Sequence, residues 1–422
     1  MVEKMNKTGD SIVIVGGGVI GAACAYYLVR EGWSVTLVDR GEFGKGCSHG
    51  NCGYVCPSHV LPLTQPGAIR EHLLGVFRRD APLRIKPHWN PRLWRWLFQF
   101  ARQCRDDLML ESAHARHQLL CSSTALYREL LAAETIDCDW ETQGLLYVFQ
   151  DLEPLEEFTA VVEFLRKEFG VSATRYDPRQ LQEVEPALCR DVAGAYCFEE
   201  DAHLRSNKLL AGWRQILNQR GVKIMEHCQV ESLVVQSGQA RAISTSGGEI
   251  SASHFVIATG AWTPQFERQL GCKIPIQPGK GYSITMPRPD LCPRFPMLFE
   301  QHHVAVTPWA SGYRLGSTME FAGYDTTIDP QRVQMLKDVA SIYLREPLVE
   351  PVEETWIGWR PMTSDDRPII GHSPTLKNVL IAAGHGMLGL TLAPATGRLI
   401  TEMLSGQTPH VDPAPFSPGR FG

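Results

Sequence analysis

Three glycines near the start of the chain have the spacing G-x-G-x-x-G, which can bring a peptide backbone close to a pyrophosphate. Gly16, Gly18 and Gly21 follow residues 12–15, a short apolar and β-branched run typical of a buried parallel strand. In such a turn the first glycine allows the tight bend, the second lets the backbone approach the phosphates, and the third lets the next helix pack on the strand. The helix predicted over residues 22–30 would direct the positive end of its dipole at the same phosphates.

An acidic residue completes this pattern. Asp39 ends a second predicted strand, residues 34–38, and lies about 20 residues beyond the glycines, where a carboxylate accepts hydrogen bonds from a ribose 2′-hydroxyl. A glycine-rich turn without a ligand is the alternative, but the two strands, the helix and the acid in register favour a bound adenine dinucleotide. Because a carboxylate at this position repels a 2′-phosphate, the pattern leaves NAD or FAD.

The C-terminal segment repeats the order of strand, loop and helix. Residues 379–383 are a predicted buried strand, residues 384–389 a GHGMLG loop, and residues 391–404 a helix that ends before Gly406. Backbone N–H groups at the start of this helix would stabilise negative charge on a bound ring. That suits a reduced flavin but not a nicotinamide, which loses its positive charge on reduction. Cofactor elements at both ends of the chain also indicate a discontinuous binding domain, and both observations favour FAD.

The composition is that of an ordinary globular protein. The 422 residues are 44% hydrophobic and 21% charged, enough for two domains, and the net charge of −5 gives no general attraction to nucleic acid. The apolar run from residue 12 is interrupted by glycines, so we expect neither a signal peptide nor a membrane span. Twelve cysteines occur without a C-x-x-C pair, which indicates reduced thiols in a cytoplasmic protein and no metal site.

The middle of the chain alternates between strand and helix patterns. Residues 230–250 show a strand pattern that is interrupted by a Ser-Gly turn at 237–238 and a Gly-Gly turn at 247–248, which is typical of a β-meander. They lead into a predicted buried strand at 255–258, which is followed by Thr259 and Gly260. The other predicted strands are residues 144–150, 194–198, 282–286, 304–307 and 313–319, and the predicted helices are residues 119–133, 154–168, 204–219 and 330–344.

One region is basic and aromatic. Residues 66–105 contain nine Arg or Lys against two Asp or Glu, with three tryptophans at its C-terminal end, and a helical pattern begins at Pro91. This region is either a face that meets a membrane surface or quinone, or an amphipathic helix that packs on its own domain with solvated arginines. Its apolar stripe at helical spacing consists of Trp94, Leu97, Phe98 and Ala101.

Several motifs together carry a family resemblance. Beside the glycine turn these are GKGCSHGNCG, ATGAWTP, WIGWRPMTSDDRPIIG and AAGHGMLGLTLAPATGRLITEML, and LPLTQPG, EVEPAL, PGKGYSI and FSPGRF extend the similarity over nearly the whole chain. The sequence resembles the D-amino-acid oxidase/glycine oxidase superfamily of FAD enzymes. Within this superfamily it is similar to the bacterial D-amino-acid dehydrogenases, as their small subunit or single chain.

The resemblance implies a fold of mixed α/β and α+β class. A discontinuous Rossmann-like FAD-binding domain, with a parallel sheet and the β-meander, is expected over residues 1–85, 200–270 and 353–422. A substrate domain built on an antiparallel sheet is expected over residues 86–199 and 271–352. The flavin would lie at the boundary between the two domains.

The resemblance also implies the cofactor residues. The loop with Ser48, Asn51 and Gly53 is expected to contact flavin and pyrophosphate, and His385 to contribute its backbone rather than its ring. An attachment of the flavin through His49 is a further hypothesis. The full expected set is Gly16, Gly18, Val19, Ile20, Gly21, Asp39, Arg40, Cys47, Ser48, Asn51, Cys52, Gly53, Val230, Thr259, Gly260, Gly384, His385, Gly386, Met387, Leu388 and Gly389.

Three residues are implied for catalysis. Arg360 matches the residue that binds the substrate carboxylate, and a planar guanidinium can hold a carboxylate through two hydrogen bonds. The alternative for Arg360 is a structural ion pair with Asp365 or Asp366. Tyr282 is either a hydroxyl that caps the substrate or a half-buried tyrosine of a sheet, and Arg314 either a basic group near the flavin or a surface arginine.

The implied reaction is oxidation of a D-amino acid, with a hydride moving from Cα to flavin N5. D-Proline, a hydroxyproline and D-alanine are all acceptable substrates on the sequence alone. The expected electron acceptor is a quinone, a dye or the respiratory chain, and the protein would be cytoplasmic or peripheral on the inner face of the cell membrane. The alternatives are a glycine or sarcosine type of amine oxidase that uses oxygen, a non-catalytic flavoprotein subunit of a complex, and an NAD-dependent dehydrogenase.

Overall fold

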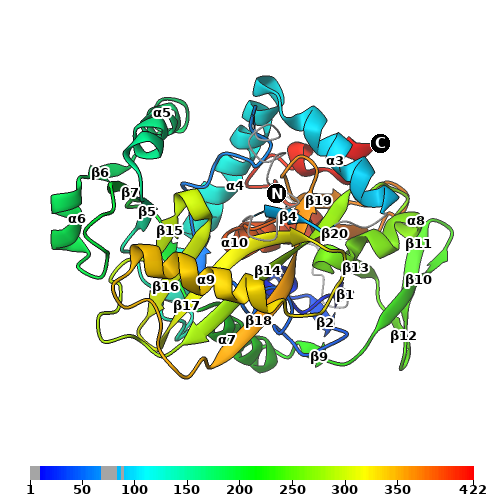
Figure 1. Ribbon diagram of the computed structural model, residues 1–422. Helices are drawn as coiled ribbons and strands as arrows, with labels where there is room; N and C mark the ends of the chain where they lie inside the picture. Colours follow the sequence, from blue (N-terminus) through cyan, green and yellow to red (C-terminus); the bar gives the residue numbers. More distant parts are fainter. Residues whose placement is uncertain (1–9, 68–82, 87–89) are drawn as a thin grey trace.

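The computed structural model describes residues 10–67, 83–86 and 90–422 (Figure 1). Within these residues the strands form two large sheets, a three-stranded sheet and a two-stranded one, and helices cover the large sheets. The first large sheet is mainly parallel and the second mainly antiparallel. This arrangement confirms the mixed α/β and α+β fold expected from the sequence.

The first sheet has six described strands in the order β19-β20-β13-β1-β2-β9, and every neighbouring pair except β19 and β20 is parallel. Alternate residues of β1 face two different cores: Ile12 and Ile14 pack toward helices, and Val13 and Val15 toward the opposite face. The continuous apolar run therefore reflects burial on both faces. The strands are β1 Ser11–Val15, β2 Ser34–Val38, β9 Lys223–Met225, β13 His254–Ile257, β19 Ile369–His372 and β20 Val379–Ala383.

Helices from both ends of the chain pack on this sheet. Helix α1 (Val19–Arg30) follows the glycine turn, and α10 (Gly389–Ser405) follows the GHGMLG loop and ends at Gly406 in a left-handed conformation, with φ of +65°. The two helices touch at Gly397, where a Cβ would lie 2.6 Å from the carbonyl oxygen of Ala23. The predicted strand, turn and helix at each terminus are thus confirmed, and they are neighbours in one layer.

The predicted meander covers the other face of the sheet. It consists of β10 (Val230–Gln236), β11 (Gln239–Thr245) and β12 (Gly248–Ser251), paired antiparallel in sequence order. Its inward side chains, among them Leu233 and Ile243, join the core of Val13 and Val15. In Figure 1 these strands stand at the edge of the molecule, beyond β13 and α8.

The second sheet follows the order β18-β14-β17-β16-β15-β5-β7-β6, with β4 paired to β17. Helix α9 packs on one face, where Leu336 and Tyr343 contact the sheet core, and Figure 1 shows the helix crossing in front of the strands. Two pairs, β5 with β15 and β4 with β17, are parallel, so the sheet is mixed rather than purely antiparallel. The strands are β4 Leu83–Ile85, β5 Leu145–Phe149, β6 Thr174–Tyr176, β7 Gly194–Phe198, β14 Ile276–Met286, β15 Met297–Phe299, β16 Val304–Trp309, β17 Gly312–Phe321 and β18 Glu354–Thr363.

Two segments of the second sheet fall outside the expected substrate domain. The predicted boundaries at residues 85 and 353 place β4 and β18 with the cofactor domain, whereas both strands pair within the second sheet. The long β14 explains the place of β18, because its eleven residues offer one edge to β17 and the other to β18, and β4 in turn pairs with the end of β17. The assignment of the remaining segments to two domains stays a prediction.

Helix α3 (Pro91–Gln103) buries a different face from the predicted stripe. Asn90 caps its start by accepting hydrogen bonds from two backbone N–H groups, and Leu93 and Trp96 are the buried residues. Trp94 and Phe98 are instead 47% and 64% exposed. Trp96 decides the register, because its indole N–H donates to the carbonyl of Met362 and so fixes that side inward.

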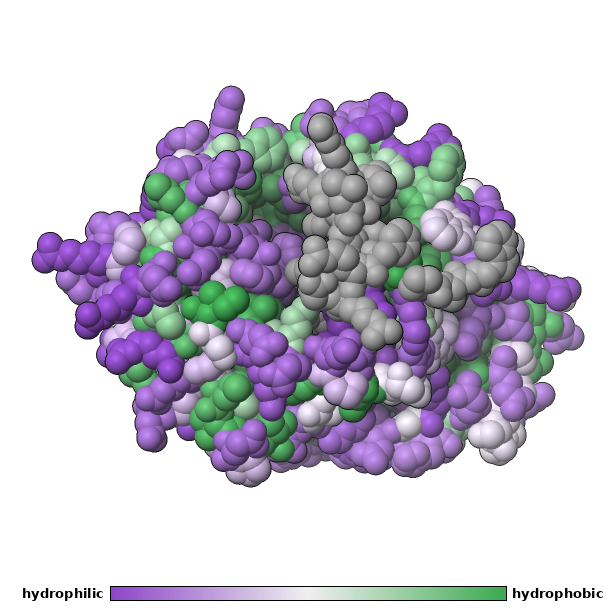
Figure 2. Space-filling view, viewed as in Figure 1, coloured by the Kyte–Doolittle hydropathy of each residue, from purple (hydrophilic) through white to green (hydrophobic). Residues whose placement is uncertain are grey.

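The remaining helices connect strands within one sheet or between the sheets. Helix α4 (Asp106–Ala133) begins thirteen residues earlier than predicted and packs along α10. No helix in the described part is both long and apolar enough to cross a membrane. Figure 2 shows a mostly hydrophilic face with scattered apolar residues. The other elements are α5 Leu152–Phe169, α6 Pro178–Val184, α7 Ser206–Gln219, α8 Glu267–Leu270, α9 Pro330–Tyr343, the 3₁₀ segments η1 Gly260–Phe266, η2 Glu300–His302, η3 Ala414–Phe416 and η4 Pro418–Phe421, and the paired β3 Tyr54–Val55 and β8 Ala202–His203.

Candidate active site and cofactor cavity

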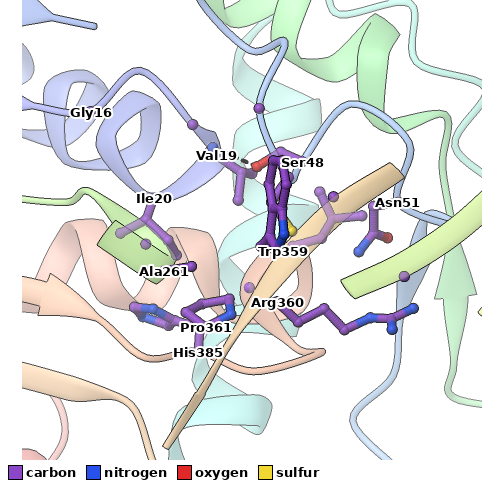
Figure 3. Close-up of a pocket in the computed structure, with 18 of the residues that line it drawn as sticks. Gly16, Val19, Ile20, Ser48, Asn51, Ala261, Trp359, Arg360, Pro361 and His385 are labelled. Atoms are coloured by element: carbon purple, nitrogen blue, oxygen red, sulfur yellow. Dashed lines mark hydrogen bonds between the residues drawn. The ribbon is translucent and has the colours of Figure 1, made fainter. Parts of the chain in front are cut away.

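A cavity of about 480 Å³ lies between the two large sheets and receives side chains from both (Figure 3). Most residues expected around the cofactor line it, although they come from four separate parts of the chain. These lining residues are Gly16, Gly18, Val19, Ile20, Asp39, Arg40, Cys47, Ser48, Asn51, Cys52, Val230, Thr259, Gly260, His385, Gly386, Met387, Leu388 and Gly389, together with Tyr282 and Arg360. Gly21, Gly53, Gly384 and Arg314 are not among them.

The glycine turn has the geometry that the spacing predicts. Gly16 has φ of +113°, and a Cβ there would lie 2.4 Å from the carbonyl oxygen of Ala258. A Cβ at Gly21 would lie 1.8 Å from the carbonyl oxygen of Gly16, so Gly21 permits helix packing and does not face the cavity. Asp39 ties the turn together, because its two carboxylate oxygens accept hydrogen bonds from the N–H groups of Gly17 (2.6 Å) and Gly41 (2.8 Å).

The loop at residues 46–53 joins the first sheet to the second. The Ser48 hydroxyl accepts from the N–H of Val19 at 3.1 Å, the bond drawn in Figure 3. Asn51 accepts from the N–H of Gly53 at 2.7 Å through its side chain. Gly53 has φ of +87°, and a Cβ there would lie 1.8 Å from the carbonyl oxygen of Leu204, so it shapes the loop and leaves the cavity to its neighbours.

Arg314 holds this loop from below and does not reach the cavity. Its guanidinium donates to the carbonyl oxygens of His49 (3.2 Å) and Asn51 (2.8 Å) and to the Thr285 hydroxyl (3.0 Å), and the residue is 1% exposed. Glu354 lies 3.6 Å away and balances its charge. Arg314 is thus not a surface arginine, and it does not line the cavity as a basic group beside the flavin would. It is a buried residue that positions the loop.

His49 is turned away from the cavity. Its Nε2 lies 2.8 Å from the Glu354 carboxylate, and burial lowers the pKa of the imidazole. The ring does not line the cavity, so the geometry gives no support to a flavin attached through His49. Burial likewise raises the pKa of the Cys47 thiol to about 11, which keeps it neutral beside the cavity at physiological pH.

The GHGMLG loop brings the start of α10 to the cavity. Gly384 and Gly386 have φ of +74° and +54°, and the N–H of Gly386 donates to the carbonyl of Pro361 at 3.1 Å. The His385 ring bonds to the Thr396 hydroxyl at 2.9 Å, and burial lowers its pKa to about 3. A neutral ring engaged inside the helix fits the expectation that His385 offers its backbone to a ligand.

Arg360 lies on β18 in the cavity wall and is labelled in Figure 3. Its Nη1 donates to the carbonyl oxygen of Thr318 at 2.6 Å, and a Cβ on Gly281 would lie only 2.6 Å from the same nitrogen. Glycine on the neighbouring strand thus leaves the space that the guanidinium occupies. Burial lowers the pKa of Arg360, but an arginine stays protonated at neutral pH.

The carboxylates that offered Arg360 a structural ion pair are bound elsewhere. Asp365 pairs with Arg420 at 2.7 Å and Arg367 at 3.2 Å, and Asp366 pairs with Arg116. Among the described residues, no carboxylate comes within ion-pair distance of Arg360. Within the described part of the chain, the hydrogen-bond acceptor of this guanidinium is the neutral Thr318 carbonyl, so its charge faces the cavity.

Strained backbone supports this arginine. Ser317 and Thr318 have φ of +106° and +54°, at a point where β17 carries an extra residue against β14. Side chains other than glycine rarely adopt these angles, and such strain gathers at functional sites. The bulge turns the Thr318 carbonyl to Arg360 and Ser317 into the cavity wall.

Tyr282 lies beside the cavity with its hydroxyl directed elsewhere. The hydroxyl donates to the Glu320 carboxylate at 3.0 Å, and the ring packs in the core under α9. Hydrogen bonding and burial raise the pKa of Tyr282, with burial the larger cause. Side chains alternate along a strand, so Gly281 faces the cavity and Tyr282 the opposite face. The hydroxyl is thus not placed to cap a substrate.

Sequence reasoning missed two groups of lining residues. Three tryptophans, Trp262, Trp356 and Trp359, stand inside motifs already singled out, and the Arg40 guanidinium stacks 3.6 Å from the ring centre of Trp262. The second group had no motif to signal it, because its members are single residues of loops and strands. It consists of Tyr54, His59, Leu145, Tyr147, Leu298, Ala305 and Ser317.

Comparison with known proteins now places the chain. The family described as DAO, FAD dependent oxidoreductase, matches residues 11–403. The chain belongs to this family of FAD-dependent oxidoreductases. A D-amino acid dehydrogenase from Methylobacterium nodulans is 32% identical, covering 97% of this chain and 99% of the relative, and one from Paramagnetospirillum magneticum is 30% identical, covering 94% and 95%.

Solved structures show the same fold. The glycine oxidase from Geobacillus kaustophilus superposes with a TM-score of 0.79 at 23% identity, covering 97% of this chain and 99% of the other. The L-proline dehydrogenase from P. horikoshii gives 0.72 at 20% identity, covering 98% and 97%. The family match over residues 11–403 and the curated relatives confirm the expected family and its FAD cofactor, and the solved structures confirm the fold.

The cavity fits an FAD. The glycine turn and Asp39 offer what a pyrophosphate and a ribose require, and the start of α10 offers backbone N–H groups to a ring. The loop glycines keep these surfaces free of side chains. We propose that the lining residues named above hold the cofactor.

The role of Arg314 leads to a prediction about cofactor affinity. Replacing Arg314 by Gln removes the cation that holds two loop carbonyls, and the loop should then bind FAD less tightly. Because hydrogen bonds to a charged group contribute about 1.5–3 kcal/mol, we expect the Kd for FAD to rise at least about tenfold. Titration of the apoprotein with FAD measures this.

Arg205→Gln is the matched control. Arg205 stacks on the same Trp309 ring, at 5.5 Å against 5.0 Å for Arg314, but it donates to Ser311 and not to the loop. We expect this variant to bind FAD as the natural protein does. Equal FAD affinity in both variants would show that Arg314 does not hold the cofactor loop.

Proposed function

We propose that the protein oxidises D-amino acids. FAD held by the lining residues would supply the two-electron acceptor for a hydride that leaves Cα together with its electron pair. The iminium acid left behind would be hydrolysed by water to a 2-oxo acid and ammonia. The observation that carries this proposal is the charge of Arg360, which faces the cavity without a carboxylate partner among the described residues. A buried cation in this state needs an anion, and an amino acid supplies one in its carboxylate.

Arg360 would fix the orientation of the substrate. Two of its N–H groups can bind both oxygens of a carboxylate, which sets the direction of the bond to Cα. The carbonyl of Thr318 and the absence of a side chain at Gly281 hold the guanidinium in place before a substrate arrives. Such preorganisation converts binding energy into correct alignment of the C–H bond.

The cavity also favours a neutral substrate amine. Its lining carboxylates, Asp39 and Glu42, belong to the glycine-turn end, and none of the described residues that line the sheet end is acidic. An ammonium group next to Arg360 would meet like charge and low polarity, so the site selects the amine that has lost its proton. No general base from the protein is then required.

The start of α10 would stabilise the products of the transfer. The first backbone N–H groups of α10, which begins at Gly389, have no preceding turn of the helix to bond to and present the positive end of its dipole to the cavity. Negative charge that develops on a ring bound there is stabilised without reorganisation of the protein. The relatives named D-amino acid dehydrogenase agree with this chemistry.

Anaerobic mixing with substrates tests the proposal. We expect D-amino acids to bleach the visible flavin band of the purified protein and L-amino acids to leave it unchanged. Air should restore the band slowly and a soluble quinone rapidly. Bleaching only by glycine or sarcosine, with rapid peroxide formation, would assign the alternative amine-oxidase function. A yellow protein that no amino acid bleaches would contradict the proposal.

Replacing Arg360 by Leu should remove the carboxylate contact and spare the cofactor. We expect the KM for D-amino acids to rise at least about a hundredfold, since charge-assisted pairs with two hydrogen bonds are worth several kcal/mol. Steady-state kinetics with a dye acceptor measures the rise, and the ratio of flavin to protein shows that FAD is retained. Arg360→Lys should give an intermediate KM. An unchanged KM in Arg360→Leu would return this residue to a structural role.

We further propose that the protein passes electrons to a quinone at a membrane surface, where α3 makes the contact. Trp94 and Phe98 are largely exposed on this helix, and Arg92, Arg95 and Arg102 are exposed beside them. The Arg102 guanidinium lies 5.9 Å from the Phe98 ring centre. Aromatic rings that enter a lipid interface next to arginines that meet anionic headgroups are the usual means of peripheral attachment.

Vesicle sedimentation tests this surface. The double substitution Trp94→Ser and Phe98→Ser should weaken binding to phosphatidylglycerol vesicles about tenfold or more, because each aromatic side chain contributes 1.5–3 kcal/mol or so on burial. The control Leu152→Ser removes another exposed apolar residue, 61% exposed, whose neighbours in sequence are the acidic Asp151 and Glu153. Equal binding of both variants, or no binding by the natural protein, would contradict the proposal.

A further inference from the structure

A row of register-paired residues crosses the second sheet on the face that forms the cavity wall. Ala305 on β16 is paired with Leu298 on β15, and Leu298 with Tyr147 on β5, while Ser317 on β17 is paired with Val304 next to Ala305. Ser317, Ala305, Leu298 and Tyr147 all line the cavity. Because neighbouring strands lie about 4.8 Å apart, this row spans roughly 14 Å from β17 to β5.

The row starts at the arginine and ends at two polar groups. Arg360 contacts β17 through the carbonyl of Thr318, one residue from Ser317. At the far end the Tyr147 hydroxyl lies 3.2 Å from Nδ1 of His59. We call Ser317, Ala305, Leu298, Leu145, Tyr147 and His59 the sheet arm of the cavity. Its residues are small beside the arginine, apolar in the middle and hydrogen-bonding at the tip.

The tip of the sheet arm is rigid. Phe158 stacks on the Tyr147 ring at 5.5 Å and Phe198 meets it edge-on at 5.0 Å. Arg116 donates to the backbone carbonyl of His59 at 2.9 Å and is itself paired with Asp366. Aromatic contacts on one side and a buried ion pair on the other therefore hold the two polar groups at a fixed place.

The sheet arm carries no formal charge. Its described lining residues include no Lys, Arg, Asp or Glu. Burial, with Arg116 as the second cause, lowers the pKa of His59 to about 4, so the ring is neutral at physiological pH. A charged substrate side chain would lose its hydration in this arm without gaining a partner. An apolar or phenolic side chain loses little and removes its own surface from water.

We propose that the sheet arm is the side-chain subsite and makes large, uncharged D-amino acids of phenylalanine and tyrosine size the preferred substrates. The inference rests on the proposed function, since it takes the carboxylate to be at Arg360. With the carboxylate fixed there, the side chain crosses Ser317 and Ala305, packs on Leu298 and ends at Tyr147. Glycine and D-alanine leave the arm unfilled and lose that contact.

The proposal is tested by comparing a large with a small substrate, and by a substitution that narrows the arm. We expect the natural protein to show a kcat/KM for D-phenylalanine at least about tenfold above that for D-alanine, the usual scale of discrimination by a fitted apolar pocket. The substitution Ala305→Leu narrows the arm at its middle and should lower this ratio at least about tenfold. A ratio below one in the natural protein, or a ratio that Ala305→Leu leaves unchanged, would overturn the subsite.

The tip is tested with two matched tyrosines. Tyr147→Phe removes the hydroxyl in the arm and should lower the ratio of kcat/KM for D-tyrosine to D-phenylalanine about threefold to tenfold, the value of one hydrogen bond. Tyr196 pairs with Tyr147 in the sheet, but its hydroxyl bonds to Thr159 and the residue does not line the cavity. Tyr196→Phe should therefore keep the ratio. The same ratio in both variants would overturn the role of Tyr147.

A binding measurement separates this inference from the proposed function. Propanoate and 3-phenylpropanoate carry the carboxylate but no amine, so neither is oxidised, and binding perturbs the flavin absorption spectrum. We expect 3-phenylpropanoate to bind at least about tenfold more tightly, and Ala305→Leu to remove the difference. If no amino acid bleaches the flavin but this difference is found, the subsite stands and the activity is wrong. Equal binding of the two acids to a protein that oxidises D-amino acids would overturn the subsite alone.

Discussion

The buried guanidinium of Arg314 ties the two halves of the molecule together at the cavity. It lies on the second sheet, and it binds carbonyls of a loop whose Ser48 caps a helix of the first sheet. Burying a cation costs several kcal/mol unless hydrogen bonds replace its hydration, and here two carbonyls, a hydroxyl and the distant Glu354 replace it. The loop conformation is therefore coupled to this ion, and the loop residues Cys47, Ser48 and Asn51 form part of the cavity wall.

Arg360 has fewer hydrogen-bond acceptors around its guanidinium than Arg314. It is a second guanidinium on the same face of the same sheet, but its single described acceptor is the Thr318 carbonyl. The N–H groups of Arg314 bond to protein acceptors, and the residue has a structural role. Several N–H donors of Arg360 have no acceptor among the described residues. The two arginines differ in hydrogen-bond supply and in exposure, because Arg314 is 1% exposed whereas Arg360 is only partly buried in the cavity wall. Both differences mark Arg360 as the one that awaits a ligand. The strained bulge at Ser317 and Thr318 is the local cost of that arrangement.

The cofactor half of the site could be predicted from the sequence because its chemistry is local. A strand, a glycine turn, a helix start and Asp39 lie within thirty residues, and each glycine answers one steric demand. Of the substrate half, only Arg360 could be named, through the family resemblance, and it lines the cavity. The other lining residues could not be predicted, because there the strand period decides which side chain faces the cavity. Tyr282 and Gly281 are neighbours in sequence, yet one packs under α9 and the other makes room for Arg360. The stripe on α3 failed for a similar reason, since the indole of Trp96 found its partner on a distant strand.

The residues of the sheet arm also could not be predicted from the sequence. Ala305 and Leu298 lie on neighbouring strands of one hairpin, but Tyr147 is distant in sequence, and only the pairing of β15 with β5 brings it into the same row. Nothing in their types suggests a site: a small, an aliphatic and an aromatic residue on strands usually mean a core. Here these side chains line the cavity, on the sheet face opposite the core that contains Val304 and Val306. Strand pairing and strand period, rather than residue type, therefore decide which side chains border the space in which we place the substrate side chain.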